Sequence, residues 1–346
     1  MSDTGVSFSH LLRLSDETGL LEHACGATPR RGYGYCVDDA ARGLVVICRE
    51  PEPDDALAKL AETYLALLAH AQAPDGRCRN RLSYDRRWED EPGLGDWWGR
   101  ALWGWGTAAA RSADPWVRDD ALECFERSAH RRSAHPRTMA FATLGAAEVL
   151  ARNPSHPAAL GIAAGYAEMF CGSPTSERRS EPPSAAWPWP EPRLTYANAL
   201  LPEALVAAGV ALADDRLLAR GLDLLGWLLD IETLDGHLSV TPVGGWGPGE
   251  PRPGFDQQAI EAAAIADACA RAFAVTHDPR WPAGVDRALG WFLGDNDAGV
   301  PMCDPGTGGG YDGLSANRAN SNQGAESTLA LIATLQQSRR LAASIT

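Results

Sequence analysis

Twelve Ala- and Leu-rich segments follow one another along this chain, and in each of them apolar residues recur at three- and four-residue spacing. That spacing places the apolar side chains on one face of an α-helix, so each segment is predicted to be an amphipathic helix. Strand-like patterns are short, and only 238–240 and the stretch around 82–84 suggest small β-hairpins within loops. The predicted helices cover residues 6–14, 38–49, 54–72, 97–110, 115–132, 137–151, 157–171, 196–212, 215–230, 257–276, 280–294 and 323–337.

The connections between the predicted helices alternate in length. Short ones such as 50–53, 153–156 and 213–214 join the two helices of a hairpin. The others are long, aromatic and glycine-rich, and cover 14–37, 73–95, 172–194, 231–255 and 295–322. Loops of that length are uncommon inside a compact domain unless they serve a function. A helical hairpin with one long loop thus recurs at steps of roughly 40 to 65 residues, which indicates a repeat architecture.

Six repeats of this kind predict an all-α fold, a closed (α/α)6 toroid in which six outer helices surround six inner ones. Asp-Gly pairs at 75–76 and 235–236 each stand about twenty residues before a predicted inner helix and support the repeat. An open solenoid of helical pairs would show a more uniform period near ~34 residues and would lack the long loops. We therefore expect residues 1–346 to form one toroidal domain, with minor β-hairpins at the mouth of its cavity.

Polar residues gather where the inner helices are predicted to begin. Five of the six starts open with Asp, Asn, Gln or Tyr. A capping role explains any single acid at a helix start, but in a closed ring all six starts point at one cavity mouth. Carboxylates and amides that line a cleft suit the hydroxyl groups of sugars. The residues expected there are Asp38, Asp39, Asp96, Asn198, Asp256, Gln257, Gln258, Asn322 and Gln323.

A second set of charges follows four or five residues later, which is one helical turn deeper in the ring. It consists of Arg42, Arg100, Glu203, Glu261 and Glu326. Burying these charges without partners would be costly, so one interpretation is an Arg–Glu network that holds the inner helices in register. For Glu261 and Glu326 a second interpretation is open, because an unmatched carboxyl in a polar cavity can have a raised pKa and act as an acid.

Aromatic residues are concentrated in the long loops. The chain has 12 Trp, and of these Trp103, Trp105, Trp227 and Trp291 lie on predicted helix faces and are expected in the core. A Trp in a Gly- and Pro-rich loop at a cavity mouth offers a flat face on which a sugar ring can stack. The loop and loop-adjacent residues expected to bind substrate are Tyr35, Tyr84, Asp85, Arg86, Trp88, Trp98, Trp187, Trp189, Glu191, Tyr196, Trp246, Tyr311 and Asp312.

Composition argues against several classes of protein. The chain carries 31 basic and 45 acidic residues, a formal net charge of −14, which disfavours binding to nucleic acid or to anionic membranes. It has no apolar run of about 18 residues and no pattern typical of a secretory signal. The eight cysteines are scattered without a CxxC pair, so neither a disulfide framework nor a Cys- and His-based metal site is expected. We expect a cytoplasmic protein that requires no cofactor or metal, although a carboxylate-rich mouth could hold Ca²⁺.

Six strings carry a resemblance beyond these patterns: GYCVDDAARG, LSYDRRW, GRALWGWG, FDQQAIEAAAIADA, WFLGDND and YDGL followed by NQGAEST. Together they resemble a bacterial family of (α/α)6 proteins described as glycosyltransferase-associated or glycoside-hydrolase-like. Members of that family often form the C-terminal part of chains with a retaining glycosyltransferase domain, so the resemblance implies a free-standing form here. It spans nearly the whole chain and implies carbohydrate chemistry, but a shared fold does not select the reaction.

Inverting hydrolysis of a glycosidic bond is the reaction that the paired carboxylates favour. It needs a general acid and a general base roughly 6.5–9.5 Å apart, with room for a water molecule. A helix N-terminus lowers the pKa of an Asp, so an acid at a helix start is expected to suit the base. The candidates are Asp38 or Asp39 on one side of the cavity and Asp256 or Asp96 on the other, with Glu261 or Glu326 as the alternative acid.

Other reactions known for toroids fit the sequence in different ways. Phosphorolysis would use the same acid, with phosphate held by basic residues such as Arg86 and Arg87. Epimerisation is disfavoured, because His135 alone among the eight histidines lies at an inner helix start. A lyase would need a base such as Tyr196 or Tyr311, and the acids at the mouth disfavour its polyanionic substrates.

A module that binds glycans without catalysis is the remaining alternative. It would use the same Trp-lined groove but would not need a poised acid and base. The partners expected from the sequence are therefore an oligosaccharide or glycoside substrate, together with a glycosyltransferase that acts in the same pathway.

Overall fold

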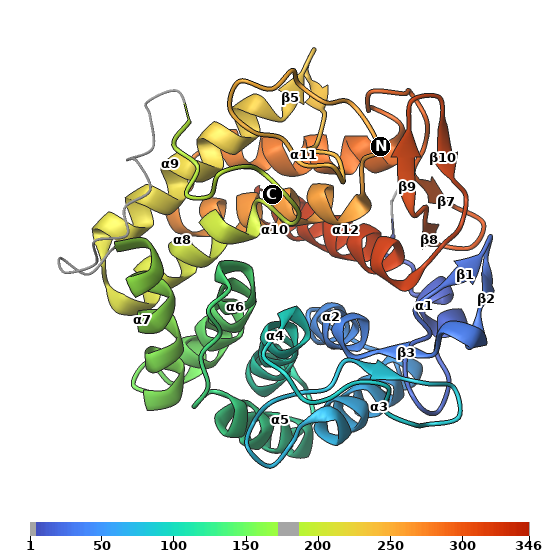
Figure 1. Ribbon diagram of the computed structural model, residues 1–346, viewed down its shortest axis with the longest axis vertical. Helices are drawn as coiled ribbons and strands as arrows, with labels where there is room; N and C mark the ends of the chain where they lie inside the picture. Colours follow the sequence, from blue (N-terminus) through green and yellow to red (C-terminus); the bar gives the residue numbers. More distant parts are fainter. Residues whose placement is uncertain (1–4, 172–186, 346) are drawn as a thin grey trace.

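The computed structural model describes residues 5–171 and 187–345, and its helices form a closed ring around a central axis (Figure 1). The inner helices are α2 (Val37–Cys48), α4 (Asp96–Arg111), α6 (Pro136–Arg152), α8 (Leu200–Leu212), α10 (Ala259–Thr276) and α12 (Ala325–Ile345). The outer helices are α1 (Ser9–Leu14), α3 (Asp55–Ala71), α5 (Pro115–Ser128), α7 (Pro157–Cys171), α9 (Asp215–Ile231) and α11 (Arg280–Leu293). The (α/α)6 toroid predicted from the sequence is confirmed.

The last inner helix closes the ring on the first. Each inner helix packs against the next one along the chain, and α12 packs against both α10 and α2. Five outer helices cover the inner helix that precedes them in sequence, whereas α1 packs against α12. The sixth helical pair is therefore built from segments at opposite ends of the chain, and its formation requires the whole ring.

All twelve predicted helices are present, and three of them differ from the prediction by four residues or more at one end. The helix predicted over 115–132 ends at Ser128. The helix predicted over 196–212 begins at Leu200, because Ala197 adopts a left-handed φ of 45° and donates its N–H to the carboxylate of Glu261. The helix predicted over 323–337 continues to Ile345, since no Pro or Gly interrupts that segment.

The strands of the described residues form five short antiparallel pairs in the loops. They are β1 (Ala24–Cys25) with β2 (Thr28–Pro29), β3 (Tyr35–Cys36) with β4 (Arg81–Leu82), β5 (Thr233–Leu234) with β6 (His237–Leu238), β7 (Cys303–Asp304) with β8 (Gly309–Gly310), and β9 (Gly313–Ser315) with β10 (Arg318–Asn320). Both predicted hairpins are present: β6 pairs with β5, and Leu82 bridges Trp88. Leu82 also pairs with Tyr35, so β4 ties the loop before α4 to the start of α2.

Large aromatic side chains fill the layer between the inner and outer helices. Trp105 and Trp291 are fully buried, as the sequence predicts, and so is Trp98. Each buried aromatic of this size removes about 150–250 Å² from water and contributes strongly to core stability. Within the described residues, no helix combines the length and the apolar character needed to cross a membrane.

Helices α4 and α6 approach each other more closely than side chains would allow, and glycines make this possible. A Cβ atom on Gly145 would lie 2.1 Å from the carbonyl oxygen of Leu102, and one on Gly106 would lie 2.2 Å from that of Gly145. Both neighbours are backbone atoms, which cannot move aside without displacing a helix. The α4–α6 contact therefore depends on glycine at these two positions.

We expect Gly145→Ala to lower the free energy of unfolding by about 2–3 kcal/mol, because the overpacking cost exceeds the roughly 1 kcal/mol that alanine gains in helix propensity. Urea unfolding followed by circular dichroism measures this loss. Gly244→Ala is the matched control, since a Cβ atom there meets nothing within 4 Å. Equal stability of the two variants would contradict the close packing of α4 against α6.

Candidate active site

A polar cleft opens at the end of the ring where the inner helices begin. It consists of two adjoining cavities of about 350 Å³ and 650 Å³ that share Gln258, Asp312 and Asn320. Asp256, Gln257 and Arg318 line only the larger cavity. The smaller cavity is lined by residues that include Glu22, His23, Cys36, Asp38, Asp39, Arg42, Arg81 and Glu326. The cleft thus combines carboxylates, amides, arginines and a histidine, a set that suits a polyhydroxylated ligand.

Arg42 lines the smaller cavity and joins two carboxylates. Its Nη2 pairs with Asp39, which is one turn earlier on α2, and its Nη1 lies 3.0 Å from Oε2 of Glu326 on α12. The guanidinium is largely buried, whereas the side chain of Glu326 is 41% exposed. The network predicted between Arg42 and a Glu of another inner helix is therefore present, and it links the first inner helix to the last.

Asp38 and Asp39 are adjacent in sequence but differ in their ionisation. Although burial opposes the charge on Asp38, the guanidinium groups of Arg100 and Arg42 hold its pKa below the usual value. Burial raises the pKa of Asp39 to about 7, and the charges of Asp38 and Glu326 reinforce this effect against that of Arg42. The expectation that the helix N-terminus lowers the pKa thus fails for Asp39, because desolvation dominates there.

A separate polar network occupies the start of α4, α6 and α8. Asp96 accepts hydrogen bonds of 2.6 Å from Thr138 Oγ1 and from the hydroxyl of Tyr196. Arg137 pairs with both carboxylate oxygens of Glu191, at 2.6 and 2.7 Å, and also donates to Asn198. These residues do not line the cleft. The predicted arrangement, in which Asp96 faces Asp38 or Asp39 across one cavity, is therefore not present.

Glu261 connects this network to α10. Its carboxylate accepts hydrogen bonds from the backbone N–H of Ala197 and from the N–H and Nδ2 of Asn198, the last two at 3.1 and 3.2 Å. Burial, reinforced by the nearby Glu232, raises the pKa of Glu261 to about 8. The raised pKa foreseen from the sequence is present, but the side chain holds the loop before α8 and does not line the cleft.

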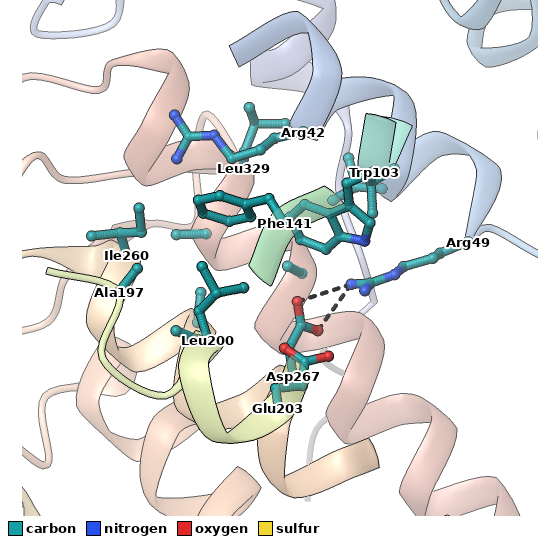
Figure 2. Close-up of a pocket in the computed structure, with 16 residues that line it drawn as sticks. Arg42, Arg49, Trp103, Phe141, Ala197, Leu200, Glu203, Ile260, Asp267 and Leu329 are labelled. Carbon is teal, nitrogen blue, oxygen red and sulfur yellow. Dashed lines mark hydrogen bonds and ion pairs between the residues drawn. The ribbon is translucent and has the colours of Figure 1, made fainter. Parts of the chain in front are cut away.

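Below the cleft, apolar side chains fill the axis of the ring (Figure 2). Phe141 of α6 stacks on Trp103 of α4 with ring centroids 5.9 Å apart, and the remaining space is only about 60 Å³. Beyond this apolar layer, Arg49 pairs with Asp267 at 2.9 Å. The interior charges therefore form two separate tiers, at the mouth and at the opposite end.

The predicted aromatic residues divide between exposed and buried positions. Tyr84 and Tyr196 are exposed, Tyr311 is partly buried, and Trp88 is partly buried against His70. Trp187 and Trp246 are partly buried and pack edge to face with ring centroids 5.8 Å apart. The remaining three are buried core residues, which is a correction to the expectation that they bind substrate: Tyr35, Trp98 and Trp189.

Several predicted polar contacts with substrate are instead contacts within the protein. Gln257 is fully buried and accepts a 2.8 Å hydrogen bond from the indole of Trp291, and Gln323 accepts one of 2.7 Å from Thr307. Asn322 accepts from the N–H of Gly26. Asp85 and Arg86 are exposed and lie outside the cleft, and Arg86 pairs with Glu17.

Several residues of the cleft were not predicted, and three of them are charged or titratable groups from segments outside the inner helices. Glu22 and His23 follow α1, and Arg81 belongs to β4; none of them lies at an inner helix start. Ring closure brings the segment after α1 next to α12, and the β3–β4 pairing brings Arg81 next to α2. Both placements depend on contacts between residues far apart in sequence, so no local pattern signals them.

Glu22, Cys36 and Asp39 place three possible metal ligands within 4.8 Å of one another. Glu22 is paired with Arg81, however, and Asp39 is paired with Arg42. Both carboxylates are thus already neutralised by guanidinium groups, which a cation would have to displace. This cluster therefore fits a hydrogen-bonded polar site better than a metal site.

Comparison with known proteins supports the fold. No family model and no curated protein matches this sequence. Cellobiose 2-epimerase from Spirochaeta thermophila is similar in structure, with a TM-score of 0.68 at 13% identity over 97% of this chain and 94% of that one. A cellulase of C. cellulolyticium bound to cellobiose has a TM-score of 0.62 at 8% identity, with 98% and 90% covered. A GH76 α-mannanase from Bacteroides thetaiotaomicron has a TM-score of 0.58 at 9% identity, with 90% and 88% covered.

These three proteins are carbohydrate-processing enzymes that catalyse different reactions. At identities this low, the likeness shows the (α/α)6 toroid fold and not the reaction. The resemblance to glycosyltransferase-associated proteins stays a prediction.

The buried Glu232 provides a test of the electrostatics behind the cleft. Burial raises its pKa to about 7, while one carboxylate oxygen accepts from Thr241 and the other has no hydrogen-bond partner. As pH rises between the unfolded and folded pKa values, the unfolded state loses its proton first, so stability falls. We expect this loss, on the order of 2 kcal/mol between pH 5 and 9, to be absent in Glu232→Gln.

Urea unfolding at a series of pH values measures the effect. Glu52→Gln, at an exposed position, serves as the control and is expected to keep the pH dependence of the wild type. A Glu232→Gln variant with the same slope of stability against pH as the wild type would contradict the raised pKa.

Proposed function

We propose that this protein is an inverting glycoside hydrolase that acts on an oligosaccharide in the cleft at the mouth of the toroid. The observation that carries the proposal is Asp39, a buried carboxyl with a pKa raised to about 7, in a cleft with further carboxylates. A group with a pKa near neutrality can hold a proton and still donate it, as a general acid requires. The toroid neighbours that process carbohydrates support this chemistry through their fold.

Asp39 is assigned as the proton donor to the leaving glycosidic oxygen. Asp256 is assigned as the base, because it is exposed in the adjoining cavity and can activate water there. Glu326 binds the same guanidinium as Asp39, so these two carboxylates lie on the same side of the cleft. Inversion requires attack from the face of the sugar opposite the acid, which favours Asp256 over Glu326 as the base.

The charge of the cleft restricts its substrate. Carboxylates outnumber arginines among its lining residues, and they disfavour a polyanionic sugar. Gln258 and Asn320 lie between the two cavities and can donate to or accept from sugar hydroxyl groups. The proposed substrate is therefore a neutral oligosaccharide.

Epimerisation of the sugar is a second candidate, favoured by one specific observation. His23 lines the cleft with its Nε2 3.7 Å from Glu22, and a histidine can remove and return a proton near neutral pH. The sequence disfavours this reaction because His135 alone among the histidines lies at an inner helix start. In the structure, however, His23 lines the cleft from the segment after α1. Because the fold is similar to that of a cellobiose 2-epimerase, the experiment below also tests for epimerisation.

Phosphorolysis through Arg86 and Arg87 has less support. Both side chains are exposed and paired, Arg86 with Glu17 at 2.6 Å and Arg87 with Asp85 at 3.1 Å. Neither lines the cleft, so the arginines near the candidate acid are Arg42 and Arg81. An accessory role beside a glycosyltransferase stays the non-catalytic alternative.

One experiment separates these reactions. Purified protein is incubated in D₂O with a panel of α- and β-linked oligosaccharides, with and without phosphate, and products are followed by NMR and mass spectrometry. Hydrolysis yields shorter sugars whose first-formed anomer reports inversion or retention. Phosphorolysis yields a sugar phosphate only when phosphate is present. Epimerisation yields an isomer that has gained deuterium, and binding without any product supports the accessory role.

We expect Asp39→Asn and Asp256→Asn each to lower turnover by a factor of 10² to 10⁴ while oligosaccharide binding is retained, as loss of a general acid or base requires. Steady-state kinetics and titration calorimetry measure the two effects. Asp119→Asn, an exposed acid on the outer helix α5, is the control and is expected to leave both unchanged. Unchanged turnover in both cleft variants would overturn the assignment of the acid and base.

The raised pKa of Asp39 also predicts the pH dependence of the reaction. The acid must carry its proton, so kcat/KM is expected to fall about tenfold for each unit of pH above about 7. A pH–rate profile recorded between pH 5 and 9 measures this descending limb. Activity that stays constant up to pH 9 would show that Asp39 is not the proton donor.

A further inference from the structure

The opposite end of the ring holds a second large cavity, far from the cleft. It has a volume of about 770 Å³ and lies between the C-terminal parts of α2, α4, α6 and α12. Asp39 lies at the mouth in the first turn of α2, and Arg49, which directly follows the last residue of α2, lines this cavity about 15 Å further along the helix axis. The apolar layer around Phe141 and Trp103 lies between the two sites (Figure 2).

Cations outnumber anions in this cavity. Two acids, Glu50 and Glu148, line it, and the lining arginines are Arg49, Arg111, Arg152, Arg339 and Arg340. The chain as a whole carries 31 basic and 45 acidic residues, so the excess of arginine here runs against the composition of the protein. A local positive field in an acidic protein indicates a partner with negative charge.

Three of these arginines have carboxylate partners. Arg49 pairs with Asp267 at 2.9 Å, Arg111 with Glu148 at 2.7 Å, and Arg339 with Glu50 at 2.8 Å. These pairs neutralise both lining acids and one acid behind them. They leave Arg152 and Arg340 as the lining arginines that form no ion pair within the described residues.

Arg152 and Arg340 have no carboxylate within 4.0 Å among the described residues. Arg152 donates from Nε to the carbonyl oxygen of Ala110 at 2.7 Å, which leaves its two Nη groups to other acceptors. Desolvation and the charge of Arg49 lower the pKa of Arg340, and Arg271 and Arg111 add to this effect, whereas the charge of Asp267 opposes it.

Helix ends alone do not account for this arrangement. The negative end of a helix attracts arginine, and Arg111 and Arg152 each lie in the last turn of their helices. Arg340 lies more than one turn before the end of α12 at Ile345. Gln336, also on the cavity wall, is itself buried and donates from Nε2 to the carbonyl oxygen of Val46 at 2.8 Å.

We propose that this cavity binds the phosphate group of a small metabolite, with Arg340 and Arg152 as its main ligands. The planar guanidinium group matches the oxygen geometry of phosphate and donates two parallel hydrogen bonds to it. The two positive charges without ion-pair partners match a phosphate group, which carries between one and two negative charges near neutral pH. The site is remote from the cleft, so it does not depend on the proposed glycosidase activity.

Titration calorimetry of the full chain at constant ionic strength tests the proposal, with inorganic phosphate, glucose 1-phosphate and glucose as probes. We expect saturable binding of the two phosphate compounds and none of glucose at this site. Glucose 1-phosphate that binds tenfold or more tightly than phosphate would identify a sugar phosphate as the ligand. Equal affinities would identify the phosphate group alone, and both results support the site.

Variants place the site in the structure. Arg340→Gln is expected to weaken phosphate binding about tenfold or more, and the double variant with Arg152→Gln to abolish it. Arg340→Lys keeps the charge without the planar group and is expected to bind with intermediate affinity, which guards against a folding defect in the glutamine variant. Arg216→Gln, an exposed arginine on α9, is the matched control and is expected to bind as the wild type does.

Two results would overturn the proposal. One is the absence of saturable binding of either phosphate compound to the folded wild-type protein. The other is binding that survives in the Arg152 and Arg340 variants but is lost in Arg81→Gln, because that pattern would place the anion in the cleft at the mouth. Neither result depends on oligosaccharide turnover, so failure of this site and failure of the proposed activity are distinguishable.

Discussion

Arg42 binds Asp39 on its own helix and Glu326 on α12, and this pairing joins the first inner helix of the ring to the last. The cleft exists only because α12 packs against α2, since its walls come from segments at both ends of the chain. Closure also brings Glu22 and His23, which follow α1, to the same place. A toroid that failed to close would separate the candidate acid from Glu326 and Glu22, two of the charged groups that act on its pKa.

Desolvation decides the ionisation of the groups at the mouth. Asp38 and Asp39 occupy successive positions in the first turn of α2, so the helix dipole acts on both. Arg100 compensates for the burial of Asp38, whereas Asp39 shares Arg42 with Glu326 and has acidic neighbours. Two adjacent carboxyl groups therefore have pKa values that move in opposite directions, as a site with an acid and an ionised carboxylate requires.

The two ends of the ring differ in charge because an apolar layer separates them. Phe141, Trp103 and their neighbours fill the axis and leave about 60 Å³, too little space for a polar channel. Charges at the mouth and at the opposite end therefore form independent networks, each closed by its own ion pairs. The cleft, in which carboxylates predominate, and the arginine-rich cavity consequently differ in charge.

The sequence by itself determined the repeat of helical hairpins, because three- and four-residue apolar spacing acts within each segment and needs no distant contact. It also located Asp38, Asp39, Asp256, Gln258, Asp312 and Glu326, which do line the cleft. Only the tertiary structure decided that Trp98 is core, that Asp96 and Glu261 hold a separate network, and that Glu22 and Arg81 enter the cleft. Those outcomes depend on which side chains become buried and on which charges from distant segments come into contact when the ring closes. Local sequence spacing determines neither.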